Sequence, residues 1–307
     1  MNESNIIDYD LFGNIVEKDV LLRDKFIEPP FSVLDTKSGN WQKRKQLWRN
    51  LGIKSETGRK DDMTFKGNMK SFDYYRQKEG KVKHSKEQGT SIFDPALCEV
   101  LYRWFCKEKG SILDPFAGGS VRGVVANYLG YNYTGIDIRQ EQIDSNREQA
   151  MDILEITNQP NWYVGDSDKV LDGGFNKEFD FVFSCPPYSD LEVYSDLEDD
   201  ISNMPYNRFM SIYESIISKS CKLLKDGCYA CFVVGEIRNK KGNYIGFVPD
   251  TISAFKKCGM ELYNEAILLN PIASASMRAN GNMKSDKLVK VHQNILVFKK
   301  NMGKDNA

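Results

Sequence analysis

The chain has 307 residues, with 42 Lys and Arg against 43 Asp and Glu, so its net charge is -1 and any contact with a polyanion must be local. Apolar residues make up 41% and charged residues 28%, which excludes collagen-like, disulfide-scaffold and wholly disordered proteins. Seven cysteines, an odd number in a chain of this length, indicate reduced thiols.

The sequence contains no signal for a membrane or a metal. No stretch reaches the roughly 18 apolar residues that cross a bilayer, and the first ten residues lack the order of a signal peptide. We therefore expect a cytoplasmic protein. Cys228 and Cys231 form a C-x-x-C within β-type residues and no second pair follows, so a buried strand is the better interpretation. With His84 and His292 as the two histidines, we expect no metal site.

The first 90 residues are polar and irregular and are predicted to form a basic extension of loops and short helices. Residues 36–90 contain 15 Lys and Arg against 6 Asp and Glu, a net charge of +9. The segment from Trp41 to Leu51 mixes Trp41 and Trp48 with clustered cations, which suits contacts with nucleic-acid phosphates and bases. Packing of both Trp side chains on the main domain is an equally good interpretation.

From residue 91 the pattern alternates between helix and strand, which is typical of an α/β domain with a mostly parallel sheet. Helices are expected at residues 95–105, 121–129, 140–154, 206–224 and 249–258. Strands are expected at residues 111–113, 133–137, 162–164, 179–184, 228–234, 262–269 and 294–299. The chain is thus predicted to consist of an extension (1–90), an α/β domain (91–300) and a polar tail (301–307).

The first expected strand of this domain ends in a glycine-containing turn, Asp114-Pro-Phe-Ala-Gly-Gly-Ser120, and a helix follows directly. Ligands in open α/β sheets bind at the carboxyl edge, where such turns lie. Gly118 and Gly119 have no side chain that would keep a ligand off the backbone, and the helix start offers N–H groups. The turn is therefore a candidate cofactor site.

Carboxylates follow the next two strands at the same predicted edge. Asp137 can accept hydrogen bonds from both hydroxyls of a ribose, and Asp166 is placed where it could hold an adenine amino group. The G-x-G-x-x-G spacing of nicotinamide enzymes is absent. The order of these residues resembles the S-adenosylmethionine (SAM)-dependent methyltransferases instead. The resemblance implies SAM as cofactor and a site that contains Asp114, Phe116, Gly118, Gly119, Asp137 and Asp166.

The fourth strand leads into Ser184-Cys185-Pro186-Pro187-Tyr188. This run resembles the D/N/S-P-P-Y/F motif of amino-methyltransferases, which modify N6 of adenine or N4 of cytosine in DNA, and glutamine or guanine nitrogens in related families. Two prolines stiffen the backbone and leave carbonyls such as that of Pro186 turned towards the amine. Tyr188 can stack on a base rotated out of its duplex. The implied catalytic residues are Ser184, Cys185, Pro186, Pro187 and Tyr188.

The resemblance covers about residues 90–300 and identifies the chain as a member of the DNA amino-methyltransferase family. It implies a Rossmann-like fold with a seven-stranded sheet, direct methyl transfer without a metal, and double-stranded DNA as partner. Phe93 and Asp94 fall where the family places its methionine-contacting segment. The phrase from Pro29 to Asp35 is similar to a segment of phage and bacterial DNA methylases, which implies DNA modification, as in restriction–modification, in a bacterial or phage-infected cell.

Other substrates stay open, because Pro-Pro-Tyr chemistry does not depend on what carries the amine. An RNA or protein amino-methyltransferase and a catalytically weakened DNA-binding module are the alternatives, and adenine and cytosine are both possible targets. Only about 65 residues separate the glycine turn from Tyr188, so target recognition must come from the basic extension or from residues after Tyr188. Cations between residues 274 and 290 either follow phosphates or belong to a plain surface hairpin.

One residue departs from the family motif. Cys185 occupies the position of Asp, Asn or Ser, and a thiol is a weak acceptor. Three interpretations follow: Ser184 substitutes for it, the Pro186 carbonyl suffices with a water or another carboxylate, or activity is reduced. Covalent attack by Cys185 on a pyrimidine ring is disfavoured, because that chemistry resembles a Pro-Cys order with a partner Glu motif elsewhere.

Overall fold

The computed structural model describes residues 8–9, 15–16, 22–54, 93–173, 175, 178–188, 200–239, 241–270, 272 and 275–302. The chain forms two compact units, Met1–Phe31 and Ser32–Ala307. The first unit contains β1 (Asp8–Tyr9), which pairs antiparallel with β2 (Ile15–Val16), and α1 (Leu22–Phe26). Among the helices in the described part of the chain, none is both long and apolar enough to span a bilayer.

The second unit is built on an eight-stranded sheet in the order β3-β9-β10-β8-β7-β4-β5-β6. All neighbours are parallel except β10, which is antiparallel to both β8 and β9. This is the open, mostly parallel α/β sheet of Rossmann-like type that the sequence predicts. Its strands are β3 (Val33–Asp35), β4 (Ser111–Asp114), β5 (Asn132–Asp137), β6 (Asn161–Val164), β7 (Phe179–Ser184), β8 (Leu224–Val234), β9 (Met260–Leu269) and β10 (His292–Lys300).

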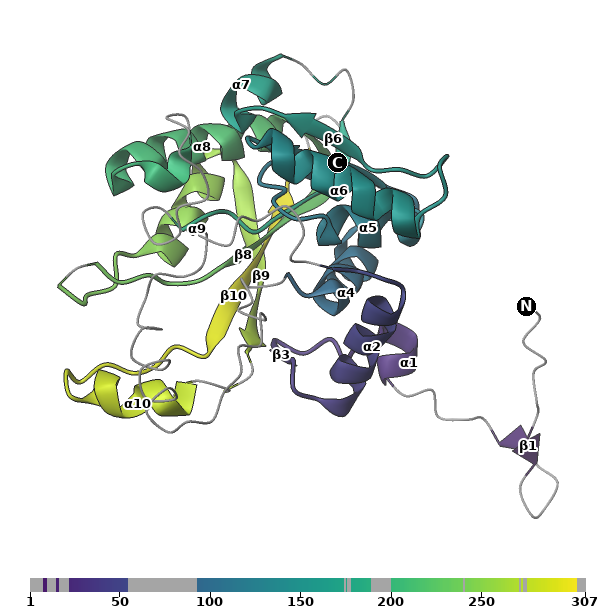
Figure 1. Cartoon of the computed structure of the whole chain (residues 1–307), viewed down its shortest axis with the longest axis horizontal. Coiled ribbons are helices and arrows are strands. Elements are labelled where there is room, and N and C mark those ends of the chain that lie inside the picture. Colours follow the sequence, from purple (N-terminus) through teal and green to yellow (C-terminus); the bar gives the residue numbers. More distant parts are fainter. Residues whose placement is uncertain are drawn as a thin grey trace, which may run out of the picture. The chain divides into compact units, whose positions relative to one another are not determined.

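Helices join the parallel strands, which cannot be connected by tight turns. In Figure 1, α4, α5 and α6 lie on one side of the sheet, and α8 and α9 lie on the other. The helices of this unit are α2 (Gly39–Asn50), α4 (Pro95–Phe105), α5 (Val121–Tyr128), α6 (Gln140–Ile153), α7 (Ser167–Asp172), the 3-10 helix η2 (Ile201–Asn203), α8 (Tyr206–Leu223), α9 (Phe247–Lys257) and α10 (Ala275–Met283).

The sheet has one strand more than predicted. The extra strand, β3, comes from the segment assigned to the basic extension, and it pairs with β9 through Val33↔Ile267 to Asp35↔Leu269. Three residues are too few to show a strand period, which is why the sequence did not reveal it. Strand β3 and helix α2 therefore fold with the sheet, whereas residues 55–90 of the predicted extension and residues 303–307 of the predicted tail lie outside the described residues.

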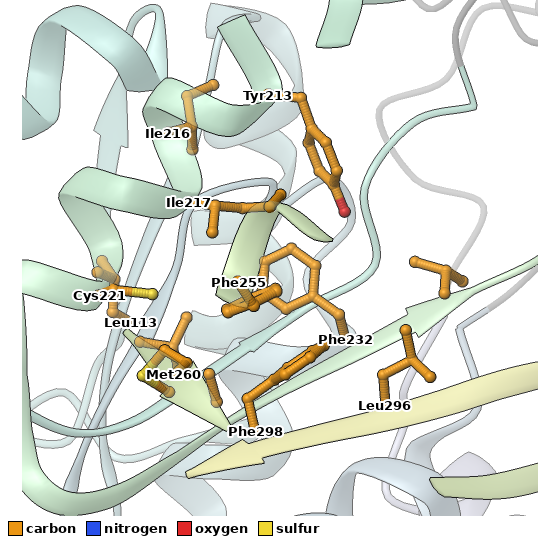
Figure 2. Packing of buried hydrophobic residues seen from close by; sticks show 14 of the residues in the cluster. Leu113, Tyr213, Ile216, Ile217, Cys221, Phe232, Phe255, Met260, Leu296 and Phe298 are labelled. Carbon is orange, nitrogen blue, oxygen red and sulfur yellow. The ribbon is translucent and has the colours of Figure 1, made fainter. Parts of the chain in front are cut away.

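The core packs the sheet against α8 and α9 (Figure 2). The Phe255 and Phe298 rings stack with centroids 4.0 Å apart, and Phe232 meets Phe255 edge-on at 4.9 Å. Every residue of β7 is buried. Since interiors are close-packed, the carboxyl end of β7 and the segment that follows it have a fixed position relative to the other strands.

The C-x-x-C pair lies in β8, as the sequence predicts. Cys231 is fully buried, and burial raises the pKa of its thiol above the ordinary value. Within the described parts of the chain, no group of three or more His, Cys, Asp and Glu side chains could hold a metal ion.

Candidate functional site

The predicted cofactor and catalytic residues meet at one edge of the sheet. Strands β7, β4, β5 and β6 are parallel neighbours, so their carboxyl ends lie together. Asp114 and Asp137 end β4 and β5, and Asp166 follows β6 by two residues. Cys185 follows β7 directly. The glycine turn and the Cys-Pro-Pro-Tyr segment thus leave adjacent strands.

Asp114 organises the interior of this edge. Its carboxylate is fully buried and accepts hydrogen bonds from Arg122 Nε (2.5 Å), the Tyr133 hydroxyl (2.6 Å), the Ser184 hydroxyl (2.5 Å) and the Phe116 N–H (3.2 Å). Four donors from the protein satisfy both oxygens. Asp114 therefore supports the turn from inside.

Arg122, on α5, is a site residue that the sequence analysis missed. Besides Asp114, it contacts the turn itself: its Nη2 donates to the carbonyls of Phe116 (2.5 Å) and Ala117 (2.8 Å). Its guanidinium lies 4.6 Å from the centre of the Phe93 ring. The sequence does contain a signal for this role of Arg122. It is the lone cation in the apolar stretch Val121-Arg-Gly-Val-Val-Ala126, and a buried charge needs a partner.

The turn leaves open space at Gly118. This residue has φ of +51°, which favours glycine, and a Cβ placed there would meet no atom within 4 Å. Its N–H donates to Asp137 Oδ2 at 3.0 Å, and its carbonyl accepts from Asn146 Nδ2 at 2.7 Å. This open space, bordered by a partly exposed Asp137, leaves room for a ligand at the turn.

The Asp137 side chain is 14% exposed and lies beside the turn. Besides the Gly118 N–H, its carboxylate accepts the Arg139 N–H at 2.9 Å. Burial raises the pKa of Asp137 above its ordinary value, and the charge and N–H of Arg139 oppose that shift. The Asp137 carboxyl is therefore expected to take up a proton at a higher pH than an exposed Asp does.

Of the remaining predicted cofactor residues, one caps a helix, two pack against aromatic rings and one lies in the turn. Asp166 caps α7 by accepting the Asp168 N–H at 2.9 Å, and Phe116 packs against Tyr213 with ring centroids 5.8 Å apart. The Phe93 ring meets Phe183 of β7 edge-on at 5.7 Å. Gly119 lies in the turn between β4 and α5.

Helix α2 holds Asp94. Trp41 Nε1 donates to Asp94 Oδ2 at 3.1 Å, and Lys45 Nζ pairs with the same oxygen at 2.9 Å. Asp94 also caps α4 by accepting the Ala96 N–H. The segment Phe93–Asp94 is thereby fixed from two sides, by α2 and by the start of α4.

The α2 contacts decide between the two interpretations of the Trp-rich segment. Trp41 and Trp48 are 1% and 4% exposed, and Trp48 Nε1 donates to Glu99 of α4 at 2.9 Å. Arg44 forms an ion pair with the same Glu99 at 2.7 Å. Packing on the main domain is confirmed, and stacking of these two Trp side chains on bases is wrong, because both rings are buried against α4.

The Cys-Pro-Pro-Tyr segment is partly embedded. Pro186 is buried, whereas Cys185 and Pro187 are half-buried. The Tyr188 hydroxyl accepts a hydrogen bond from Gln293 Nε2 at 3.0 Å, and its ring meets Phe247 edge-on at 5.8 Å. A fixed aromatic ring thus lies at the same sheet edge as the glycine turn.

Part of the chain matches the model of a known protein family. Residues 18–148 match the model of a family described as DNA methylase; the match includes the glycine turn and ends before Cys185. No curated protein matches the sequence.

Several solved structures resemble the chain in fold. TrmN from Thermus thermophilus is 14% identical, with 70% of this chain and 51% of that chain covered and a TM-score of 0.46. A SAM-dependent methyltransferase from Methanosarcina mazei is 14% identical (65% and 96% covered, TM-score 0.42). Magnesium protoporphyrin IX methyltransferase from Synechocystis, with bound SAM, is 12% identical (76% and 93%, TM-score 0.41). The chain spans about half the length of TrmN. Over residues 18–148, the chain is therefore similar to the DNA methylase family.

Proposed function

We propose that this protein transfers a methyl group from SAM to N6 of adenine or N4 of cytosine in double-stranded DNA, on a base rotated out of the duplex. The observation that carries the proposal is the adjacency of β4 and β7, which pair through Leu113↔Val182. Neighbouring strands lie about 5 Å apart. The turn for the methyl donor and the segment for the amine are therefore within reach of one another.

The chain's own residues would bind SAM in the open space beside Gly118. Asp137 would accept the ribose hydroxyls and Asp166 the adenine amino group, while Arg122 and Asp114 hold the turn in shape. SAM supplies an electrophilic methyl group on a sulfonium. The polar network around Asp137 supports this use, because its partly exposed carboxylate is already oriented by two backbone N–H groups.

On the acceptor side, Tyr188 would stack on the flipped base and the Pro186 carbonyl would accept a hydrogen from the amine. Such an acceptor favours the tetrahedral nitrogen needed for attack on the methyl group. Ser184 is a poor substitute for the missing acceptor at Cys185, because its hydroxyl is fully buried and donates to Asp114. This favours the Pro186 carbonyl, with Cys185 as a weak partner.

Replacing Cys185 by Asn is expected to raise kcat for DNA methylation about 2- to 10-fold, because an amide oxygen accepts a hydrogen bond worth about 0.5–1.5 kcal/mol more than a thiol does. Steady-state kinetics with saturating SAM would measure it, and Cys185→Ala would control for loss of the sulfur. A Cys185→Asn enzyme slower than wild type would show that the thiol is adapted to its role.

SAM affinity is expected to fall as the pH is lowered. The fall should begin at a higher pH than it would with an exposed Asp at this position. Ribose hydroxyls donate to the ionised carboxylate, and the pKa of Asp137 is raised by burial, so protonation removes the acceptor above the usual Asp range. Calorimetric titrations between pH 7.5 and pH 5, on the wild type and Asp137→Asn, would measure it. If the pH dependence is unchanged in Asp137→Asn, another group is responsible.

The test of the function is incubation with tritiated SAM and unmethylated genomic DNA, followed by digestion to nucleosides and chromatography. Label in N6-methyladenine or N4-methylcytosine is the expected result and identifies the base. Label in neither, with tight SAM binding confirmed separately, would contradict the proposal. Parallel reactions with RNA and cell protein would then distinguish another amine substrate from a weakened DNA-binding module.

A further inference from the structure

A cluster of cations surrounds one exposed aromatic ring after β8. Arg238 and Tyr244 form an antiparallel bridge, and the Arg238 guanidinium lies 3.9 Å from the Tyr244 ring centre. Lys290 Nζ lies 5.9 Å from the same ring, which is 48% exposed. Lys287 contacts the bend between them, since a Cβ on Gly242 would be 2.2 Å from Lys287 Nζ. We call Arg238, Tyr244, Lys287 and Lys290 the basic surface.

Within the described part of the chain, the cations of the basic surface have no ion-pair partner. Among the residues that the structure describes, Arg238, Lys287 and Lys290 form no ion pair with a carboxylate within 4 Å, whereas Lys107, Lys219, Lys225 and Lys257 elsewhere do. Glu236, whose charge reaches Lys290, accepts the N–H groups of Gly246 and Phe247 at the start of α9.

The basic surface carries an excess of positive charge that a ligand can neutralise. Described residues of the segments 235–244 and 284–290 include five Lys and Arg against Glu236 and Asp286. Arg238 is held in place by its bond to the Gly242 carbonyl (2.7 Å) and by the Tyr244 ring. A preorganised guanidinium loses less freedom on binding an anion.

Each segment of the basic surface has one end close to Tyr188. Gly235, three residues before Arg238, lies against the Tyr188 ring: a Cβ there would be 3.4 Å from the Tyr188 hydroxyl oxygen. Gln293, three residues after Lys290, donates to the same hydroxyl. Three residues of extended chain span at most about 10 Å.

We propose that the basic surface binds the phosphate backbone of DNA next to the target base. This inference rests on the proposed function, because it uses Tyr188 as the position of the flipped base. Duplex DNA carries one negative charge per about 1.7 Å of its axis, so a surface within about 10 Å of the base faces several phosphates. The exposed Tyr244 ring suits packing on a sugar or an unstacked base.

The test uses the full-length triple variant Arg238→Gln/Lys287→Gln/Lys290→Gln. Neutralising three phosphate contacts is expected to reduce the slope of log Kd against log salt by about 2 to 3 and to raise the Kd for duplex DNA at least about tenfold. Fluorescence anisotropy with a labelled duplex measures both. The KM for SAM is expected to stay at the wild-type value, which separates backbone contacts from a disturbed cofactor site.

A second triple variant, Lys109→Gln/Lys222→Gln/Lys256→Gln, removes the same charge at the opposite edge of the sheet. These three lysines are exposed and precede β4, β8 and β9. We expect their loss to leave the salt slope within about one of the wild type. If both triple variants weaken binding equally, net charge is responsible and the basic surface is not a site.

The outcomes separate this inference from the proposed function. If the wild type methylates DNA and the Arg238/Lys287/Lys290 variant keeps the wild-type salt slope, the inference alone is wrong. If the wild type binds DNA without methylating it, and the variant loses that binding, the inference about the basic surface stands and the proposed function is wrong. Failure of the wild type to bind duplex DNA would overturn both. The single variants Lys287→Gln and Lys290→Gln provide the comparison if the triple variant does not fold.

Discussion

Replacing Arg122 by Met is expected to lower the free energy of unfolding by about 3–5 kcal/mol, because it leaves the buried Asp114 carboxylate without its charged partner. The two side chains are 6% and 0% exposed, so water cannot compensate. Arg122 also holds the carbonyls of Phe116 and Ala117, so SAM affinity should fall at least about tenfold in protein that is still folded. Urea denaturation and calorimetric titration with SAM measure the two effects.

Two further variants make the Arg122 prediction specific. Lys257→Met breaks the exposed pair with Glu214 and is expected to cost less than about 1 kcal/mol. Adding Asp114→Asn to Arg122→Met removes the orphaned charge, so the double variant should be more stable than the sum of the single effects predicts. A loss below about 1 kcal/mol for Arg122→Met would contradict a structural role for this ion pair.

Local features of the fold were predictable because they depend on neighbouring residues. Helix α4 begins at Pro95 after the capping Asp94, a pattern that marks a helix start, and it ends at Phe105 as predicted. Strand β7 has its predicted bounds, Phe179–Ser184, since a short run buried on both faces is distinct from its polar flanks. These two elements, with the glycine turn, position most of the candidate site.

Long-range contacts were not predictable in the same way. Asp114 meets Ser184 from 70 positions away, and Trp41 meets Asp94 from 53 positions away. A sequence shows which side chains need partners, yet partner choice depends on how the elements pack. The sequence therefore did not reveal that the Asp114 carboxylate accepts four hydrogen bonds from within the protein.

Replacing Tyr188 by Ala is expected to lower kcat/KM for DNA about 10- to 100-fold while the Kd for SAM stays near the wild-type value. Stacking of a base on an aromatic ring is worth about 1–3 kcal/mol, and that stacking would be lost. Tyr188→Phe keeps the ring and removes the hydroxyl that accepts from Gln293, so most activity should return. Steady-state kinetics with a duplex substrate and SAM titrations measure the two quantities.

A matched variant distinguishes stacking from general loss of an aromatic side chain. Tyr263 is 52% exposed on β9 and packs against Tyr229 at 5.5 Å, near the amino end of its strand and thus at the opposite edge of the sheet. Tyr263→Ala should leave kcat/KM within about twofold of the wild type. If Tyr188→Ala lost SAM affinity as strongly as DNA methylation, Tyr188 would support the cofactor side of the site, and the base would have to bind elsewhere.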